Sequence, residues 1–311
     1  MTGLVASGIT SVLHDAVQPQ AQVDAIGLGS IYALMAVGIG LVFGVMRLVN
    51  FAYGQLIMAG AFAIAYASGR GWPVWAGIVL CFAVVLLLSF AMDVAVFRPL
   101  RGQSAAVMLV ATFAISFLLQ SIALLWFGPL GKTATSLVAL NQPITIGSAD
   151  IRKITVVAIV TAAICLGLLL LLMSRTSLGL HMRAAAIDAP TARLLGVRAN
   201  LVSGVAVLVA GLLAAVVAVL LTVQFPTVTP TYALQDTIIV LVGVVVGGMT
   251  RLIPATLGGF LIGYVSGLLG DALPSNQSQY LPSFLFGLVI LVLLIRPDGL
   301  FTRGRGVVER V

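Results

Sequence analysis

Long apolar stretches alternate with short polar ones along most of the chain, from Ala25 to Ile295. A backbone inside lipid must satisfy its own hydrogen bonds, so we expect each apolar stretch to form a helix. The pattern predicts nine spans, at residues 25–46, 55–68, 74–96, 105–127, 154–173, 201–222, 234–249, 254–269 and 280–295. The second and the last three are shorter than the roughly 20 residues of a full crossing, so they could be tilted, extended by flanking residues or re-entrant. The expected count is therefore eight or nine.

The composition also indicates a membrane protein. Hydrophobic residues make up 61% of the 311 residues, charged residues make up only 8%, and the mean hydropathy is +1.19. An average soluble domain has about 25% charged residues. We therefore expect an all-α, polytopic integral membrane protein with a cytoplasmic helix. Its expected parts are a polar N-terminal leader over 1–24, a transmembrane domain over 25–296 that includes a polar loop at 174–200, and a cytoplasmic tail over 297–311.

The longest polar interruption with a helical pattern of its own is Thr176–Val197. Asp188 is placed to cap the start of a short helix, and Gly196 is placed to end it. Ala192 and Leu195 recur at helical spacing and give this helix a small apolar face. The pattern predicts a helix of about two turns outside the bilayer that can dock on a partner. A helical loop without a partner is the alternative.

Basic residues are distributed unevenly among the polar segments. If Thr176–Val197 is cytoplasmic, nine spans place the N-terminus outside and the C-terminus inside. Of the 16 lysines and arginines, four then fall outside and the other 12 inside, which follows the positive-inside rule. The four are Arg70, Lys132, Arg152 and Lys153. Because the net charge of +7 is spread over many short loops, it indicates topology and not a nucleic-acid surface.

The sequence contains no pattern typical of catalysis. The two histidines, His14 and His181, lie in different polar segments, and Cys81 and Cys165 each lie inside an apolar stretch. We therefore expect no enzyme activity, no metal site and no cofactor. The segment Gly128–Thr133 superficially resembles a phosphate-binding loop but lacks its first glycine. If ATP drives this protein, another chain must bind it.

Two carboxylates, those of Asp93 and Asp236, fall within the expected spans. Asp93 lies near the end of its span, where the helix dipole opposes a negative charge, so we expect an ion pair with Arg98 or Arg101. Asp236 is expected in the first turn of its helix, at the outer surface. Ion-coupled carriers have ionisable residues deep in the bundle. No such residue is expected, which argues against a proton- or sodium-driven carrier.

The polar stretch between the first two spans is the best candidate for the lining of a translocation path. Asn50 and Gln55 contribute amide groups, and Gly54 allows a sharp backbone turn. Irregular backbone at membrane depth is tolerated where protein or a water-filled cavity satisfies it. We predict a path along Asn50, Phe51, Tyr53, Gly54 and Gln55. An ordinary interfacial loop with Tyr53 at the membrane surface is the alternative.

Glycines at every fourth position form three rows, Gly40–Gly44, Gly243–Gly247 and Gly259–Gly263–Gly267. Such rows lay a groove along one helix face, so we expect close contact with neighbouring helices there.

Four motifs carry a resemblance to a known family. They lie at Arg47–Gly54, Arg98–Gly102, Leu178–Gly196 and Arg296–Phe301. In their order and spacing, the chain resembles the permease subunits of bacterial ABC importers for branched-chain amino acids, the LivH-type permeases, over about residues 25–302. Where that family often has His followed by Gly-Glu, this chain has Tyr53, Gly54 and Gln55. The difference leaves the solute open.

The resemblance implies a multi-pass permease subunit in the bacterial inner membrane. It implies four kinds of partner: a second, similar permease chain, two ATP-binding subunits, a periplasmic solute-binding protein and the lipid bilayer. It also implies that the Thr176–Val197 loop couples the permease to an ATPase. The expected coupling residues are Arg183, Asp188, Ala192, Arg193, Leu195 and Gly196. Urea, short amides and sugars are alternative solutes, and an ion-coupled carrier or an oligomeric structural membrane protein are alternatives of other classes.

Overall fold

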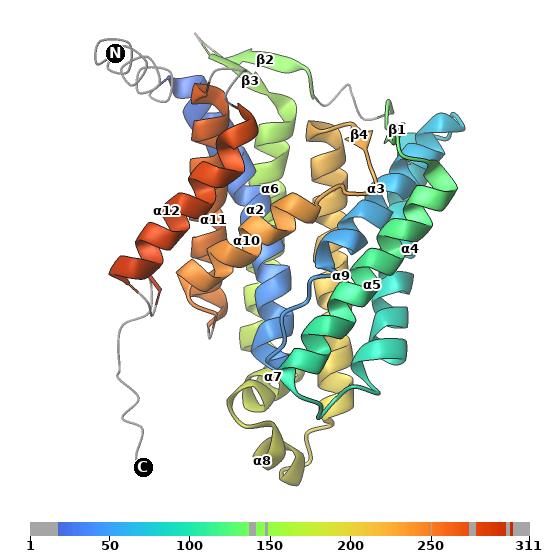
Figure 1. The fold of residues 1–311 in the computed structure, drawn as a ribbon, viewed down its shortest axis with the longest axis vertical. Coiled ribbons are helices and arrows are strands. Elements are labelled where there is room, and N and C mark those ends of the chain that lie inside the picture. Colours follow the sequence, from blue (N-terminus) through green and yellow to red (C-terminus); the bar gives the residue numbers. More distant parts are fainter. Residues whose placement is uncertain are drawn as a thin grey trace.

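The computed structural model describes residues 18–136, 141–146, 149–249, 251–273, 278–296 and 299–300. Within these residues the fold is a bundle of helices, which confirms the all-α prediction (Figure 1). The long helices are α2 (Pro19–Met46), α4 (Val74–Met92), which continues as the π-helical turn η1 (Asp93–Phe97), α5 (Ala105–Phe127), α6 (Lys153–Arg175), α9 (Ala199–Gln224) and α11 (Leu252–Ala272). The shorter ones are α3 (Tyr53–Gly69), α10 (Leu234–Gly247) and α12 (Leu281–Ile295). Six of these helices are long and apolar enough to cross a membrane, so the chain is a multi-pass membrane protein.

The two ends of the bundle differ. Helices α7 (Ser177–Ile187) and α8 (Ala189–Leu194) project from one end, which we call the loop end (Figure 1). The opposite end has two short strand pairs: β1 (Lys132–Thr133) with β4 (Thr227–Val228), and β2 (Pro143–Ile146) with β3 (Ala149–Arg152). A 3₁₀ turn, η3 (Ser278–Tyr280), precedes α12.

Helix α2 lies at the centre of the bundle. Every residue from Gly29 to Val42 is buried, because α2 is covered by α6, α9, α10 and α11. The predicted glycine row on α11 lies against it. A Cβ atom on Gly263 would lie 2.7 Å from the Cβ of Tyr32, and one on Gly267 would lie 2.7 Å from the Cα of Ala25. The α11 row therefore serves close helix packing, as predicted. The prediction is wrong at Gly44, where an added Cβ would have no neighbour within 4 Å.

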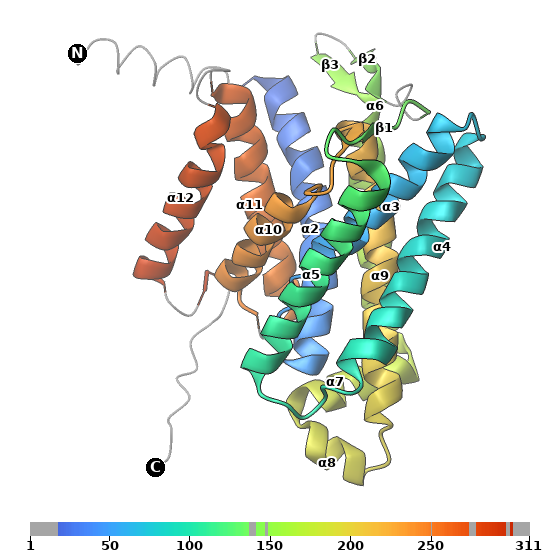
Figure 2. The ribbon, with the colours of Figure 1, turned by 45° about the vertical axis from the view of Figure 1, so that its right-hand side comes forward.

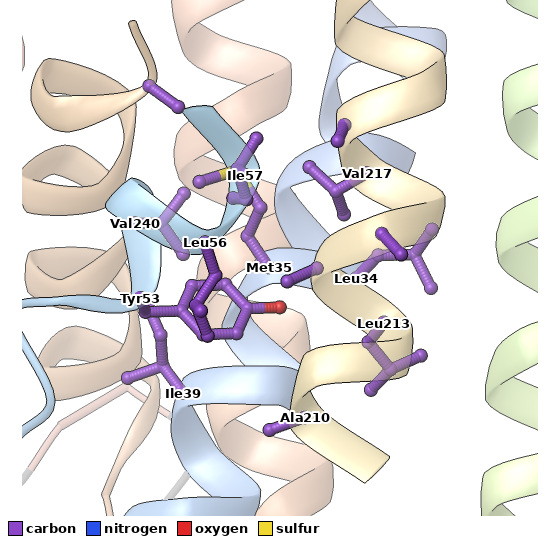
Figure 3. Packing of buried hydrophobic residues seen from close by; sticks show 14 of the residues in the cluster. Leu34, Met35, Ile39, Tyr53, Leu56, Ile57, Ala210, Leu213, Val217 and Val240 are labelled. Atoms are coloured by element: carbon purple, nitrogen blue, oxygen red, sulfur yellow. The ribbon is translucent and has the colours of Figure 1, made fainter. Parts of the chain in front are cut away.

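The chain repeats one arrangement in opposite directions. Helix α2 runs from the opposite end to the loop end, and the chain then turns back into the bundle before α3 begins (Figure 1, Figure 2). Helix α9 runs the other way, and the segment after it turns back before α10 begins. We call these two segments, 47–52 and 225–233, the first and the second reversal. The halves meet in a hydrophobic core made by α2, α3, α9 and α10, shown in Figure 3.

The reversals explain the short apolar segments. Helices α3 and α10 are short because each begins inside the bundle and the non-helical segment before it covers the rest of the depth, which is the case of extension by flanking residues among the three alternatives. Helix α11 has 21 residues and is long enough to cross, so the predicted span 254–269 was too short. At the N-terminus, α2 begins at Pro19 and includes residues 19–24 of the expected leader. Residues 1–17 and the tail from 301 to 311 lie outside the described residues.

The ion pair expected for Asp93 is confirmed, with both candidate arginines. Arg98 Nε and Arg101 Nη2 each donate to one carboxylate oxygen at 2.8 Å, and the Asp93 side chain is only 1% exposed. Arg101 Nη1 also donates to Asn200 Oδ1 at 2.6 Å. The cluster therefore fastens the end of α4 to the start of α9.

Candidate functional site

The first reversal begins with a left-handed residue. Arg47 ends α2 with φ of 56°, which directs the chain back into the bundle. Three residues later, the Asn50 side chain is buried and its Oδ1 accepts a hydrogen bond from the Ala52 N–H at 3.0 Å. Phe51 stacks on Phe113 of α5, with ring centroids 4.1 Å apart. The segment is thus held in an extended form by its own side chains.

Tyr53 and Gly54 start α3 deep in the bundle. The Tyr53 hydroxyl lies against Gly38 of α2, eight residues or about 12 Å from the end of that helix. Gly54 lies against the first turn of α10: a Cβ atom there would lie 2.8 Å from the Ala233 carbonyl oxygen and still closer to Thr237 Oγ1. The sequence suggested that Gly54 makes the turn, and this prediction is wrong. Gly54 is needed because the two helix starts touch.

Polar atoms without protein partners remain at this meeting point. The Gln55 side chain is fully buried, and neither its Nε2 nor its Oε1 has a hydrogen-bond partner. The Tyr53 hydroxyl also lacks one. An unpaired buried polar group is expensive, so the region is better suited to polar occupants than to lipid. All five residues of the predicted path lie on the first reversal or the first turn of α3.

The prediction for Asp236 is wrong in its depth. Because α10 begins inside the bundle, Asp236 in its first turn lies beside the middle of α2 and not at the outer surface. Its Oδ1 accepts a hydrogen bond from the hydroxyl of Tyr32 at 2.6 Å, and Tyr32 is at the midpoint of α2. Sequence reasoning missed Tyr32, and its only signal was a lone tyrosine within an apolar span. The bundle thus contains an ionisable residue at mid-depth, so the argument made against ion-coupled carriers from its absence fails.

The loop end contains the helix expected between Asp188 and Gly196. Asp188 Oδ1 accepts from the Thr191 N–H at 3.2 Å, and Oδ2 accepts from the Thr191 hydroxyl. These bonds lower the pKa of the Asp188 carboxyl below its ordinary value. Gly196 has φ of 87°, and the Val197 N–H closes the turn onto the Ala192 carbonyl at 3.0 Å. The predicted caps are therefore confirmed.

A second helix precedes this one, and the sequence pattern did not separate it. The side chain of Thr176 caps α7 by accepting from the Gly179 N–H at 3.1 Å. Gly179 packs directly on the end of α6, where a Cβ would lie 2.6 Å from the Met173 Cα. Met182 and Ala185 are buried against the bundle. Helix α7 thus packs against the bundle, and α8 follows it directly in the chain.

The expected coupling residues divide between buried and exposed positions. Ala192 is buried, so this side of α8 faces the protein. Leu195 is 81% exposed, Ile187 is 84% exposed and Leu194 is 87% exposed. Arg183 is exposed, and its Nε donates to the Gly179 carbonyl at 3.4 Å. Arg193 lies in α8, but its side chain is outside the described parts. Ala192 and Leu195 therefore do not share the apolar face that their spacing predicted. Three large apolar side chains, those of Ile187, Leu194 and Leu195, are exposed at the loop end.

Arg47 links the two regions. The guanidinium of Arg47 donates to the carbonyl oxygen of Ala186 in α7 at 2.8 Å. Arg47 also lines a cavity of about 350 Å³ between the end of α2, the start of α5 and α7. This hydrogen bond connects α7 to the residue at which the first reversal begins.

In the described ranges, no group of three or more histidine, cysteine or acidic residues could hold a metal ion.

Comparisons with solved structures establish the fold. A complex described as PsaBC from Streptococcus pneumoniae with a Fab matches with a TM-score of 0.55 at 12% identity, over 93% of this chain and 97% of that one. An inward-facing metal-chelate type ABC transporter matches with a TM-score of 0.52 at 17% identity, over 95% and 98%.

Comparisons with known sequences establish the family. The BraD permease protein of a high-affinity branched-chain amino acid transport system in Pseudomonas aeruginosa is 30% identical over 94% of this chain and 97% of its own length. The LivH permease protein of Escherichia coli is 27% identical over the same shares. A family model described as the permease component of branched-chain amino acid transport systems matches residues 22–294. This chain belongs to that family of transport permeases, whose members are not enzymes.

Proposed function

We propose that this chain is the permease subunit of an ABC importer that carries branched-chain amino acids across the bacterial inner membrane. The observation that carries the proposal is the family match over residues 22–294, together with relatives that are named as permease proteins for these amino acids. In this role the chain pairs with a second, similar permease. Two ATP-binding subunits act at the loop end, which is cytoplasmic, and a periplasmic binding protein delivers the solute at the opposite end.

The translocation path follows the two reversals. Asn50, Phe51, Tyr53, Gly54 and Gln55 border it from the first half of the chain, and the start of α10 borders it from the second. Unpartnered polar atoms of Tyr53 and Gln55 support this assignment, because polar groups within a membrane bundle are favoured next to water or solute. Transport then requires the two helix starts, which now touch at Gly54, to separate.

Coupling to ATP hydrolysis occurs through α7 and α8. The exposed apolar side chains of Ile187, Leu194 and Leu195 lie on a loop outside the transmembrane bundle, where exposed apolar surface favours contact with a partner protein. The capped ends at Asp188 and Gly196 fix the helix that carries Leu194, with Arg183 and Arg193 beside it. The link from Arg47 to Ala186 gives a route from this loop to the path. A conformational change needs contacts that differ between two states, and this link can supply them.

Reconstitution with the partner subunits tests the proposal. The lone chain should hydrolyse no ATP, whereas the full complex in proteoliposomes should take up leucine with hydrolysis stimulated by loaded binding protein. Radiolabelled urea serves as the competing solute. Uptake of urea but not leucine would move the assignment to another solute, and robust hydrolysis by the lone chain would contradict the role itself.

A further inference from the structure

The carboxylate of Asp236 is the most unusual group in the interior of the bundle. It lies in the first turn of α10, at the level of the midpoint of α2, and only one of its oxygens has an assigned partner, the hydroxyl of Tyr32. The positive end of the α10 dipole favours the charged form of the group. Charged residues inside a membrane are expensive and normally mark a functional site.

No cation of the protein compensates this charge within the described part of the chain. The ion pairs found there join Asp93 to Arg98 and Arg101, and Asp24 to Arg152. Asp236 takes part in none of them. A carboxylate held this deep without a basic partner is suited to a cation that comes from outside the chain.

The surroundings of the carboxylate fit an organic ammonium group. Asp236 itself is only part-buried, and the neighbouring Gln235 and Thr231 are exposed on the same stretch. Polar side chains gathered at this depth favour water, solute or protein over lipid as their neighbour. Tyr232 lies four residues before Asp236, just ahead of α10. The hydroxyl of Tyr32 bonds to the carboxylate and brings an aromatic ring close to it, and aromatic rings and carboxylates are typical partners of organic ammonium ions. A metal ion would need several more oxygen ligands.

We propose that Asp236, positioned by Tyr32, binds the ammonium group of the transported amino acid at the middle of the membrane. The inference rests on the proposed function, since it takes the solute to be an amino acid. The solute passes from the binding protein to this site and leaves it when the helix starts separate. The chain would then select for the amino group in addition to any selection by the binding protein.

The first test is Asp236→Asn in the complete complex. Asparagine keeps the shape and the oxygen that accepts from Tyr32, and it removes the charge. Leucine uptake with saturating loaded binding protein should fall about tenfold or more, whereas stimulated ATP hydrolysis should stay near the wild-type rate. Asp271→Asn is the matched control, because Asp271 is an exposed carboxylate at the far end of α11. Its uptake should be unchanged.

A second test uses the wild-type complex, so it does not depend on the folding of a variant. Thermal unfolding is measured without binding protein in the presence of leucine, leucine amide or ketoisocaproate, which is the oxo acid of leucine without its amino group. Leucine and its amide should raise the melting temperature, the oxo acid should not, and the effect should disappear in Asp236→Asn.

The outcomes separate this inference from the proposed function. If the wild-type complex takes up leucine and Asp236→Asn does so at the same rate, or if the oxo acid stabilises as well as leucine, the ammonium site is excluded and the permease role stands. If the wild-type complex takes up no amino acid at all, the proposed function fails first.

Discussion

The bundle interior and the Thr176–Val197 loop each depend on one glycine and one aspartate, for different reasons. In the bundle, Gly54 has an ordinary helical backbone and is required because the start of α10 lies against it. In the loop, Gly196 has open space around it and is required because φ is 87°. Asp93 is buried between two arginines, whereas Asp188 is exposed and its side chain accepts hydrogen bonds from Thr191, three residues away.

This contrast shows where each region gets its shape. The bundle is fixed by contacts between distant segments, so a substitution there should disturb the fold. The loop is fixed by local caps and is joined to the bundle through Gly179, Ala192 and the Arg47–Ala186 hydrogen bond. A substitution at its caps should leave the fold intact and change only how α8 is presented. The variants below test that contrast in order of decreasing effect on the fold.

Asp93→Ala should have the largest effect. It leaves Arg98 and Arg101 without their shared carboxylate, and removal of one partner of a buried pair is typically costly. Because the Arg98 side chain is 46% exposed and partly screened, we expect the lower end of that range, about 3 kcal/mol. The melting temperature of the purified chain and its yield should both fall. Asp93→Asn retains an acceptor, so its melting temperature should fall less. An unchanged melting temperature for Asp93→Ala would show that the buried ion pair does not stabilise the bundle.

Gly54→Ala should come next. The added Cβ meets a backbone carbonyl, that of Ala233, which cannot swing aside like the end of a side chain. Overpacking of this kind costs about 1–3 kcal/mol. The control is Gly287→Ala in α12, where no atom lies within 4 Å of the new Cβ. Equal melting temperatures for the two variants would show that α3 and α10 do not touch as described.

The sequence predicts the helices well and their depth poorly. The length of each apolar stretch identifies a span, because a backbone in lipid has to form a helix to satisfy its own hydrogen bonds. The residue types at Asp188 and Gly196 identify the caps. Depth depends on contacts between segments far apart in the chain, such as Gly54 with Ala233 and Asp236 with Tyr32. No local pattern encodes these contacts. Asp236 was therefore placed at the surface, although its position in the first turn of a helix was right.

Asp188→Ala should have only a local effect. It removes the acceptor for the Thr191 N–H, so amide hydrogen exchange in α8 should accelerate while the transmembrane helices stay protected. The pKa of the Asp188 carboxyl is lowered in the folded chain, so its stabilising effect is full above the ordinary value of 3.8 and is lost only as the pH falls below it. The variant should therefore differ from wild type equally at any pH near neutral. Asp188→Asn keeps an acceptor and should behave almost as wild type.

Gly196→Leu gives the most direct test of the claim that the loop couples ATP hydrolysis to transport. Leucine is strained at positive φ, so α8 should end differently while every span packs as before. Gly71→Leu is the matched control, because Gly71 also has positive φ and open space but lies in the loop between α3 and α4, at the opposite end. We predict that both variants assemble with their partners at normal levels. Leucine uptake should be lost in Gly196→Leu, with ATP hydrolysis no longer responsive to binding protein, and it should be retained in Gly71→Leu. Wild-type uptake by a normally assembled Gly196→Leu complex would contradict the coupling role of the loop.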